Sequence, residues 1–332
     1  MMDWTDRHCR YFLRGFSPHA LLYTEMITSA AIIRGKRDRL LAFNPEEHPV
    51  ALQLGGSDPK ELALAARAGE EVGYDEINLN CGCPSDRVAS GAFGACLMLE
   101  PARVADCVSA MRAAVSIPVT VKMRIGVIEA GGDKAGIGRF NDADFEALHE
   151  FVSNVAGAGC QVAIVHARKA VLGGLSPKEN REIPPLRYDV VEQLKKSFPR
   201  LPLIVNGGFR DPKEVRKALT WCDGVMLGRE AYHRPYILAE LERALHSNAS
   251  AELPTPEDLI ERMVHYAARE MARGERLSSI TRHMLGLCAG EPGAKDYRRL
   301  LSEGARHPNA RPELLREALQ SRSIALSAGT AA

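Results

Sequence analysis

The chain has 332 residues, with 43 Lys and Arg against 42 Asp and Glu, and a formal net charge of +1. Hydrophobic residues make up 45% and charged residues 26%, which is typical of a globular protein and excludes a disordered or fibrous chain. The balanced charge excludes a uniformly basic nucleic-acid coat, although a local basic face needs only a handful of residues. Because no apolar run approaches the roughly 18 residues of a membrane helix, we expect a cytoplasmic protein with no membrane partner.

Short runs rich in valine and isoleucine alternate with helical stretches along most of the chain. They predict seven strands, at residues 20–26, 49–54, 75–80, 117–123, 161–166, 201–206 and 224–228. Helical periodicity falls between them, at residues 58–71, 101–115, 142–156, 188–198 and 211–219. Strands that alternate with helices indicate a parallel sheet buried on both faces.

Seven strands are one fewer than the eight of a closed (β/α)8 barrel, which takes roughly 250 residues. The chain opens with a loop-like segment at residues 1–6 and a helical stretch at 7–13, which are the elements expected after a first strand. We therefore predict an α/β fold, a TIM (β/α)8 barrel whose first strand is missing from this chain. An open seven-stranded sheet is the alternative, but it would leave unpaired edges.

The alternation ends near residue 246. Residues 247–255 are small and polar and include a proline, which predicts a linker. Four helical stretches follow, at residues 256–274, 278–287, 294–301 and 311–324, with no strand between them. We predict a barrel domain over 1–246, a linker over 247–255, an all-α helical bundle over 256–324 and a frayed tail over 325–332. Residues 126–141 hold five glycines, and we predict a mobile loop there.

Polar residues stand at the end of almost every predicted strand. Because barrels build their active sites at the carboxyl ends of strands, these ends define the candidate site. The last two ends, Asn206-Gly207-Gly208 and Gly228-Arg229, lie where barrels often bind phosphate. Glycine lets the backbone approach a phosphate closely, and Arg229 can add a bidentate grip. The alternative is that these glycines only end the strands and bind no phosphate.

Three earlier strand ends carry Gln53, Lys122 and His166, which could line a planar ring with hydrogen-bond acceptors. A cation beside a flavin stabilises the anionic reduced ring, whereas a barrel lysine could instead form a Schiff base, as in an aldolase. Cys83 lies in a Gly-Cys-Pro turn after a strand and could be a nucleophile or a proton donor. A cysteine thiol is mostly protonated at neutral pH, which suits an acid. No second close pair completes a four-ligand zinc site with Cys81 and Cys83, so we predict no metal.

These residues together resemble one family, the tRNA-dihydrouridine synthases, in the subgroup that acts on uridines 20 and 20a of the D-loop. The resemblance covers nearly the whole chain and is carried by MMDWTDRHCRYFLR, HPVALQLGGSDP, YDEINLNCGCPSDRV, IPVTVKMRIG, HARKAVLGGLSPKENREIPPL, DGVMLGREAY and ITRHMLGLCAGEPGAKDYRRLLSE. It implies reduction of the uracil 5,6 double bond in tRNA, with bound FMN and with NADPH, or alternatively NADH, as electron source. It implies no obligatory protein partner.

The resemblance also implies roles for individual residues. Cys83 matches the proton donor to C5, while FMN delivers hydride to C6. The positions that match FMN contacts are Met1, Gln53, Lys122, His166, Asn206, Gly207, Gly208, Gly228 and Arg229. The positions that match tRNA contacts are Asn80, Lys178, Arg181, Lys295 and Arg298.

Two departures from the family pattern bear on the site. The family motif begins with a strand ending Ala-Pro-Met, of which only Met1 is present, so we expect weak flavin retention. Cys81 stands where relatives have an aliphatic residue, and we expect a spare thiol that complicates labelling of Cys83.

Three other functions stay open on the residues alone. They are a flavin barrel that acts on a small pyrimidine-like substrate, a non-catalytic tRNA-binding protein, and a phosphate-binding aldolase. The predicted helical domain favours tRNA, because a small substrate needs no clamp. Residues 271–322 hold ten Lys and Arg against six Asp and Glu, a local excess of four positive charges that the neutral total conceals.

Overall fold

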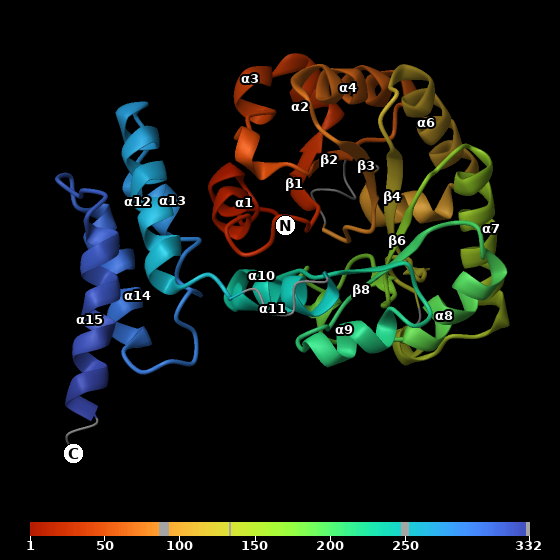
Figure 1. Ribbon diagram of the computed structural model, residues 1–332. Helices are drawn as coiled ribbons and strands as arrows, with labels where there is room; N and C mark the ends of the chain where they lie inside the picture. Colours follow the sequence, from red (N-terminus) through yellow and green to blue (C-terminus); the bar gives the residue numbers. More distant parts are fainter. Residues whose placement is uncertain (86–92, 133, 247–251, 330–332) are drawn as a thin grey trace. The chain divides into compact units, whose positions relative to one another are not determined.

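The computed structural model describes residues 1–85, 93–132, 134–246 and 252–329 (Figure 1). Its main sheet has seven strands in the order β1-β2-β3-β4-β6-β8-β9, and each pairing from β2 to β9 is parallel. The strands are β1 (Leu22–Thr28), β2 (Val50–Gly55), β3 (Glu76–Cys81), β4 (Val119–Arg124), β6 (Ala163–His166), β8 (Leu203–Asn206) and β9 (Gly224–Met226). All seven predicted strands are confirmed, with ends that shift by a few residues.

Helices follow the strands as the alternation predicts. They are α2 (Ser29–Arg34), α3 (Arg37–Leu40), α4 (Pro59–Val72), α6 (Pro101–Ala114), α7 (Asp142–Gly157), α8 (Tyr188–Ser197) and α9 (Pro212–Ala218). Local chemistry sets their ends. In α4 the Asp58 side chain accepts a hydrogen bond from the Glu61 N–H, Pro59 occupies the first turn, and Gly73 ends the helix in the left-handed region at φ +106°.

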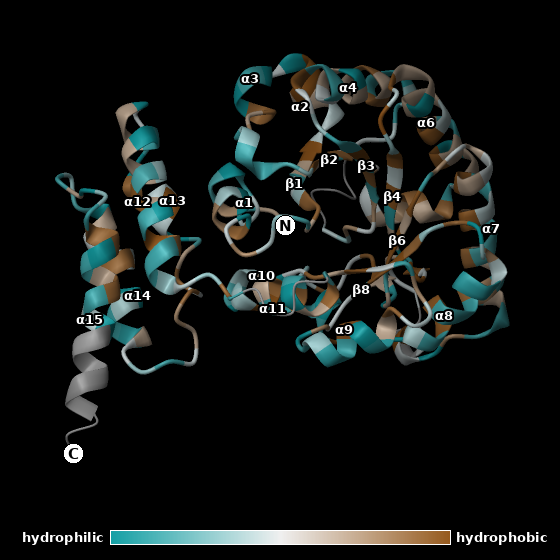
Figure 2. Ribbon diagram, viewed as in Figure 1, coloured by the Kyte–Doolittle hydropathy of each residue, from teal (hydrophilic) through white to brown (hydrophobic). Residues whose placement is uncertain are grey.

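The strands are buried between the helices. Every residue of β2 and β3 is buried, and Figure 2 shows apolar residues along the strands and hydrophilic residues along much of the helices. Burial on both faces is what a parallel sheet in an α/β protein requires. Polar residues inside such a sheet therefore need partners within the protein.

The chain forms two compact units. We call residues 23–43 and 48–227 the sheet unit, and residues 1–22, 44–47 and 228 onward the helical unit. The helical unit contains η1 (Pro45–Glu47), η5 (Gly304–Arg306) and the helices α1 (Arg7–Leu13), α10 (Arg229–His233), α11 (Tyr236–Leu245), α12 (Pro256–Ala272), α13 (Leu277–Thr281), α14 (Ala294–Glu303) and α15 (Leu314–Gly329). Residues 252–329 hold helices and no strand, which confirms the predicted helical region. The domain boundary near residue 246 stays a prediction.

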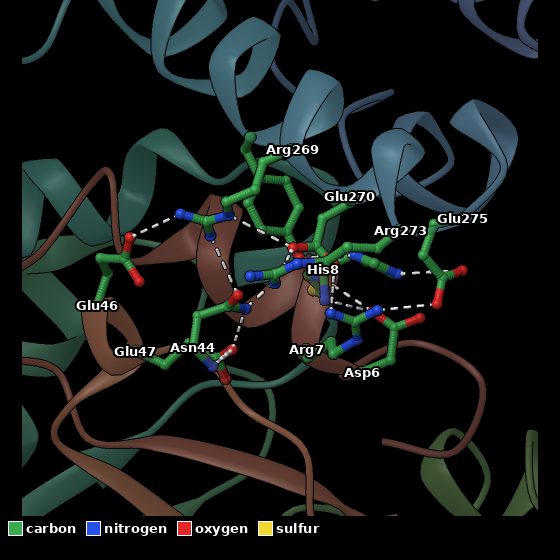
Figure 3. A network of polar contacts seen from close by, with 12 residues as sticks. Asp6, Arg7, His8, Asn44, Glu46, Glu47, Arg269, Glu270, Arg273 and Glu275 are labelled. Atoms are coloured by element: carbon green, nitrogen blue, oxygen red, sulfur yellow. Dashed lines mark hydrogen bonds and ion pairs between the residues drawn. The ribbon is translucent and has the colours of Figure 1, made fainter. Parts of the chain in front are cut away.

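Two buried carboxylates organise the helical unit (Figure 3). The Glu270 side chain, 0% exposed, pairs with Arg7, Arg269 and Arg273. Glu47, equally buried, accepts hydrogen bonds from Arg10 Nε at 2.6 Å and from the Asn44 side chain at 2.7 Å. Buried charges need such partners, because an unpaired charge away from water is costly. Glu270 thus ties α1 to α12, and Glu47 ties α1 to residues 44–47.

Asp6 connects α1 to another part of the helical unit. Its carboxylate accepts from the His8 and Cys9 N–H groups at the start of α1 and also from Arg282 at 2.7 Å. His283 lies 3.0 Å from the same carboxylate. Burial opposes the charge of Asp6, but the hydrogen bonds from His283, the Cys9 N–H and Arg282 hold its pKa well below the usual value.

Three local predictions differ from the structure. Residues 126–141 are not a plain loop, because β5 (Val127–Ile128) pairs with β7 (Ala170–Val171) and η3 (Lys134–Gly138) follows. The helix predicted at 278–287 ends at Thr281 and continues as turns. The last helix, predicted at 311–324, is α15, which begins at Leu314 and runs to Gly329. In the first case, strand pairing overrides the local signal of the glycines.

None of the helices in the described part of the chain combines the length and apolar character that a membrane crossing requires. Most of the predicted linker, residues 247–251, lies outside the described residues.

Candidate functional site

The parallel register brings the predicted strand ends together at one rim of the sheet unit. Asn80 of β3 pairs with Lys122 of β4, Arg124 of β4 pairs with His166 of β6, and His166 pairs with Asn206 of β8. Carboxyl ends of parallel strands share one edge of a sheet, and this is where barrels carry chemistry. The sequence therefore placed four of its candidate residues on neighbouring strands.

Cys83 follows β3 and is held by Asn80. The Asn80 Oδ1 atom accepts hydrogen bonds from the Gly82 and Cys83 N–H groups, both at 3.0 Å. Asn80 Nδ2 donates to Gln53 Oε1 at 2.9 Å, so these three candidate residues meet. The Cys83 thiol is half-buried and lies 3.6 Å from the Ser85 hydroxyl. Cys83 is thus a thiol at the rim whose backbone is fixed by a buried amide.

Lys122 and Asn206 form the second contact of the rim. Lys122 Nζ donates to Asn206 Oδ1 at 3.2 Å, and Asn206 Nδ2 donates to the Met226 carbonyl at 2.8 Å. Burial of the ammonium group, helped by the nearby Arg124, lowers the pKa of Lys122 to about 8. A cation held beside oriented amides suits a polar ring with hydrogen-bond acceptors, so this donor set fits a flavin.

Gly207 and Gly208 need to be glycines. Their φ angles are +118° and +79°, a region that other residues rarely adopt. A Cβ on Gly207 would lie 2.7 Å from His166 Cδ2, and one on Gly208 would lie 2.5 Å from Leu186 Cδ1. The turn after β8 therefore approaches its neighbours more closely than any side chain allows, and it presents backbone at the rim next to His166.

Arg124 is a residue of this region that the sequence analysis did not single out. It is buried, and it donates to the carbonyls of Gly82 at 3.1 Å, Asn180 at 3.0 Å and Lys169 at 3.3 Å. Gly82 adjoins Cys83. Asn180 lies on η4 (Glu179–Arg181), between the predicted tRNA contacts Lys178 and Arg181. One guanidinium thus fixes two loops. Its position at a strand end was visible in the sequence, but its direction was not.

Replacing Arg124 with lysine should weaken both loops. Lysine keeps the charge but has no planar fork to reach three carbonyls, so they lose buried partners. We expect roughly a tenfold or greater loss in the reaction proposed below, because slight misplacement of a reacting group is costly. Lys195→Arg, where Lys195 bonds carbonyls of a surface turn at 3.1 Å, is the control and should be neutral. Equal rates for the two variants would contradict the role of Arg124.

The remaining candidate residues lie elsewhere in the chain. Met1, Gly228 and Arg229 belong to the helical unit, and Met1 Sδ would lie 3.6 Å from a Cβ on Gly228. Lys295 and Arg298 are exposed on α14 of the same unit. Lys178 is exposed in the sheet unit, and Arg181 is half-buried. Their roles as cofactor or tRNA contacts stay predictions.

The expectation for Cys81 is wrong. Its side chain is 0% exposed at the end of β3, and burial raises the pKa of the thiol well above the usual range. A protonated thiol away from solvent does not react with labelling reagents. Cys81 is therefore a core residue and does not complicate labelling of Cys83.

One group of side chains in the described residues has the composition of a metal site. The ring of His19 stacks on that of His246, with centroids 4.2 Å apart, and both imidazoles face the Glu242 carboxylate. Glu242 also accepts from the Ser17 hydroxyl. Both histidines are at least half exposed, so the group is accounted for as a surface ion pair.

Comparisons with known proteins identify relatives of this chain. The family model described as dihydrouridine synthase (Dus) matches residues 1–323. A protein of Synechocystis sp. named tRNA-dihydrouridine(20/20a) synthase is 54% identical over 324 residues, which cover 98% of this chain and 93% of that protein. The protein of the same name from Escherichia coli strain K12 is 54% identical over 322 residues, covering 96% of this chain and 89% of that protein.

A solved structure shares the fold at lower similarity. The complex of 2-naphthoyl-CoA reductase with 2-naphthoyl-CoA superimposes with a TM-score of 0.52 at 12% identity, covering 72% of this chain and 47% of that chain. At this identity the likeness concerns the fold alone.

Proposed function

The chain belongs to the dihydrouridine synthase family, and from this premise we propose that it reduces the 5,6 double bond of uridines 20 and 20a in the D-loop of tRNA. The observation that carries the proposal is the rim of the sheet unit, where the Cys83 thiol, the Lys122 ammonium and the amides of Gln53, Asn80 and Asn206 converge. Because the proposed substrate is tRNA, we propose that the chain acts in the cytoplasm.

A flavin is the cofactor that the family implies, and we assign it as FMN, re-reduced by NADPH. Bound reduced FMN supplies a hydride to C6 of the uracil. Gln53, Lys122, His166 and Asn206 would hold the ring, and the backbone at Gly207 and Gly208 would approach the phosphate. Met1, Gly228 and Arg229 complete the proposed set. The Lys122 cation offsets negative charge on the ring.

Cys83 completes the reduction as general acid. Hydride addition next to a conjugated carbonyl leaves negative charge on the uracil, which a proton delivered to C5 removes. The half-buried Cys83 thiol holds that proton, and the two N–H bonds to Asn80 keep its backbone in place. The uridine must leave its stack to reach this rim, as in other enzymes that modify a base.

The helical region over residues 256–324 is proposed to bind the tRNA, with Lys295 and Arg298 on α14 as contacts to the phosphate backbone. Asn80, Lys178 and Arg181 would contact the tRNA from the sheet unit. All five positions are basic or polar, as recognition of an RNA shape requires, although Arg181 is half-buried.

The test is to incubate the full chain with FMN, NADPH and a tRNA transcript and to locate dihydrouridine by mass spectrometry of nuclease fragments. We expect two added hydrogens on each of the uridines at positions 20 and 20a. A transcript with cytidine at both positions should gain none. Free uridine should be turned over far more slowly. Efficient reduction of free uridine would contradict the tRNA claim and would favour a small-molecule flavin enzyme.

Binding of FMN should depend on the charge of Lys122. Because the pKa of Lys122 is lowered to about 8, the side chain is charged below that pH and loses its proton above it. A ligand that prefers the charged form then binds more weakly as the pH rises through 8, by up to about tenfold per unit. Fluorescence titration of the flavin-free chain with FMN from pH 6.5 to 9.5 measures the slope.

Lys122→Met is the control for this pH dependence. It should bind FMN more weakly than the wild type at pH 7 and lose the slope near pH 8. If FMN affinity changed with pH in the same way in both proteins, a group other than Lys122 would cause the pH dependence.

A further inference from the structure

A line of buried hydrogen bonds begins at Glu76, at the opposite end of β3 from Cys83. The Glu76 Oε1 atom accepts from the Tyr23 hydroxyl at 2.8 Å and from the Thr120 hydroxyl at 2.6 Å. Thr120 Oγ1 in turn accepts from Asn78 Nδ2 at 2.8 Å. Strands β1, β3 and β4 supply these side chains, and β2 lies between β1 and β3 in the sheet.

The line continues without a break to the cysteine turn. Asn78 Oδ1 accepts from Gln53 Nε2 at 2.9 Å, and Gln53 Oε1 accepts from Asn80 Nδ2 at 2.9 Å. Asn80 Oδ1 then accepts the N–H groups of Gly82 and Cys83. We call the side chains of Glu76, Thr120, Asn78, Gln53 and Asn80 the polar relay.

Each member of the polar relay is buried. Asn78 and Thr120 are 0% exposed, and Gln53, Glu76 and Asn80 are exposed by less than a tenth. A buried amide that lacks a hydrogen-bond partner costs free energy, because no water replaces the lost bond. The members of the polar relay therefore stabilise one another's orientation. Only one orientation of each amide satisfies all the hydrogen bonds of the relay, so the orientation of one amide fixes that of the next.

The direction of the relay is set at both ends. The backbone N–H groups of Gly82 and Cys83 can only donate, so Asn80 must present its carbonyl oxygen to them and its NH2 to Gln53. Gln53 must then present its NH2 to Asn78. At the far end, the Thr120 hydroxyl donates to Glu76 and is left to accept from Asn78. Reversing any amide would set two donors or two acceptors face to face.

We propose that Glu76 and Thr120 are positioning residues for the reaction: through Asn78 they orient the amides of Gln53 and Asn80 and thereby fix the backbone of Cys83. The proposal rests on the proposed function for what Gln53, Asn80 and Cys83 do, and on the hydrogen bonds alone for how they are held. Neither Glu76 nor Thr120 lies at the rim, because each precedes the end of its strand by at least four residues.

The test compares Thr120→Val with Thr120→Ser in the full chain. Valine has nearly the shape of threonine but can neither donate to Glu76 nor accept from Asn78, whereas serine keeps the hydroxyl. Tyr74→Phe is the matched control, because it removes a buried hydroxyl that donates to the Leu41 carbonyl at 3.2 Å, outside the relay.

The first readout is hydrogen exchange of the Asn80 side-chain NH2, followed by nuclear magnetic resonance. Thr120→Val should speed that exchange at least about tenfold, although Asn80 is three hydrogen bonds away, and Thr120→Ser and Tyr74→Phe should change it less than about twofold. FMN affinity and the turnover number on tRNA should fall roughly 10- to 100-fold in Thr120→Val, and Thr120→Ser should keep both close to the wild-type values.

Unchanged Asn80 exchange and unchanged FMN affinity in Thr120→Val would overturn the proposal. The wild type supplies a second test that needs no variant: the Asn80 NH2 should exchange together with that of Asn78 and far more slowly than that of exposed Asn309. Exchange of Asn80 at the rate of Asn309 would also overturn it. Hydrogen exchange does not depend on activity. A wild-type chain that makes no dihydrouridine would therefore refute the proposed function, while the exchange rates would still test the polar relay.

Discussion

Cys83→Ala is expected to lower the rate of dihydrouridine formation by about 100- to 10,000-fold, the range that a positioned general acid contributes. The alanine variant keeps the N–H group that donates to Asn80, so the turn after β3 and the buried relay stay intact. FMN affinity and tRNA affinity should therefore change little. The loss should appear in the rate constant of a single turnover, measured as dihydrouridine formed against time.

Cys96→Ala is the matched control, because Cys96 is a second half-buried thiol, which donates a hydrogen bond to the Phe93 carbonyl at 3.1 Å. It should retain nearly the wild-type rate. Cys83→Ser, which keeps a weaker acid at the same position, should fall between the two. A Cys83→Ala variant that forms dihydrouridine at the wild-type rate would remove Cys83 from the mechanism and favour a water molecule as the acid.

Glu270→Ala is expected to destabilise the helical unit by roughly 3–5 kcal/mol, the usual cost of removing one partner of a buried ion pair. Glu270 is fully buried and pairs with Arg7, Arg269 and Arg273, so alanine leaves their positive charges without the carboxylate that α12 supplies. The measurement is the urea midpoint of unfolding, followed by circular dichroism at neutral pH.

Glu261→Ala tests whether burial causes the difference. Glu261 lies on the same helix and forms a bidentate pair with Arg316 at 2.6 and 2.7 Å, but both side chains are exposed. Water screens such a pair, so its loss should barely move the midpoint. Equal midpoints for the two variants would show that the buried carboxylate contributes no more than a surface pair.

The strands and the rim of the site were predictable because both follow local rules. Alternation of short apolar runs with helical periods indicates a parallel sheet whatever the packing details, and the carboxyl ends of parallel strands must share an edge. Gln53, Asn80, Lys122, His166 and Asn206 were therefore found by reading the residue at each strand end, before any contact was known.

The polar relay carried a signal in the sequence that went unused. Glu76, Asn78 and Asn80 alternate with Ile77 and Leu79, so three polar side chains share one face of a fully buried strand. Such an alternation inside a two-sided buried sheet means that polar groups meet one another in the interior. Which groups they meet could not be read, because Gln53 and Thr120 come from other strands, whose register is a tertiary property.

By itself, the sequence determined the seven strands, the helical region after residue 252 and the residue types at the rim, since these depend on periodicity and on chain order. Only the tertiary structure decided that Cys81 is inert core while Cys83 is accessible, that Arg124 bonds two loops, and that α1 pairs with Glu270 of α12 and with Glu47. The physical reason is that burial and hydrogen-bond direction depend on what lies opposite a residue in space, and these partners of Arg124, Glu47 and Glu270 lie 37 to 263 positions away in the chain.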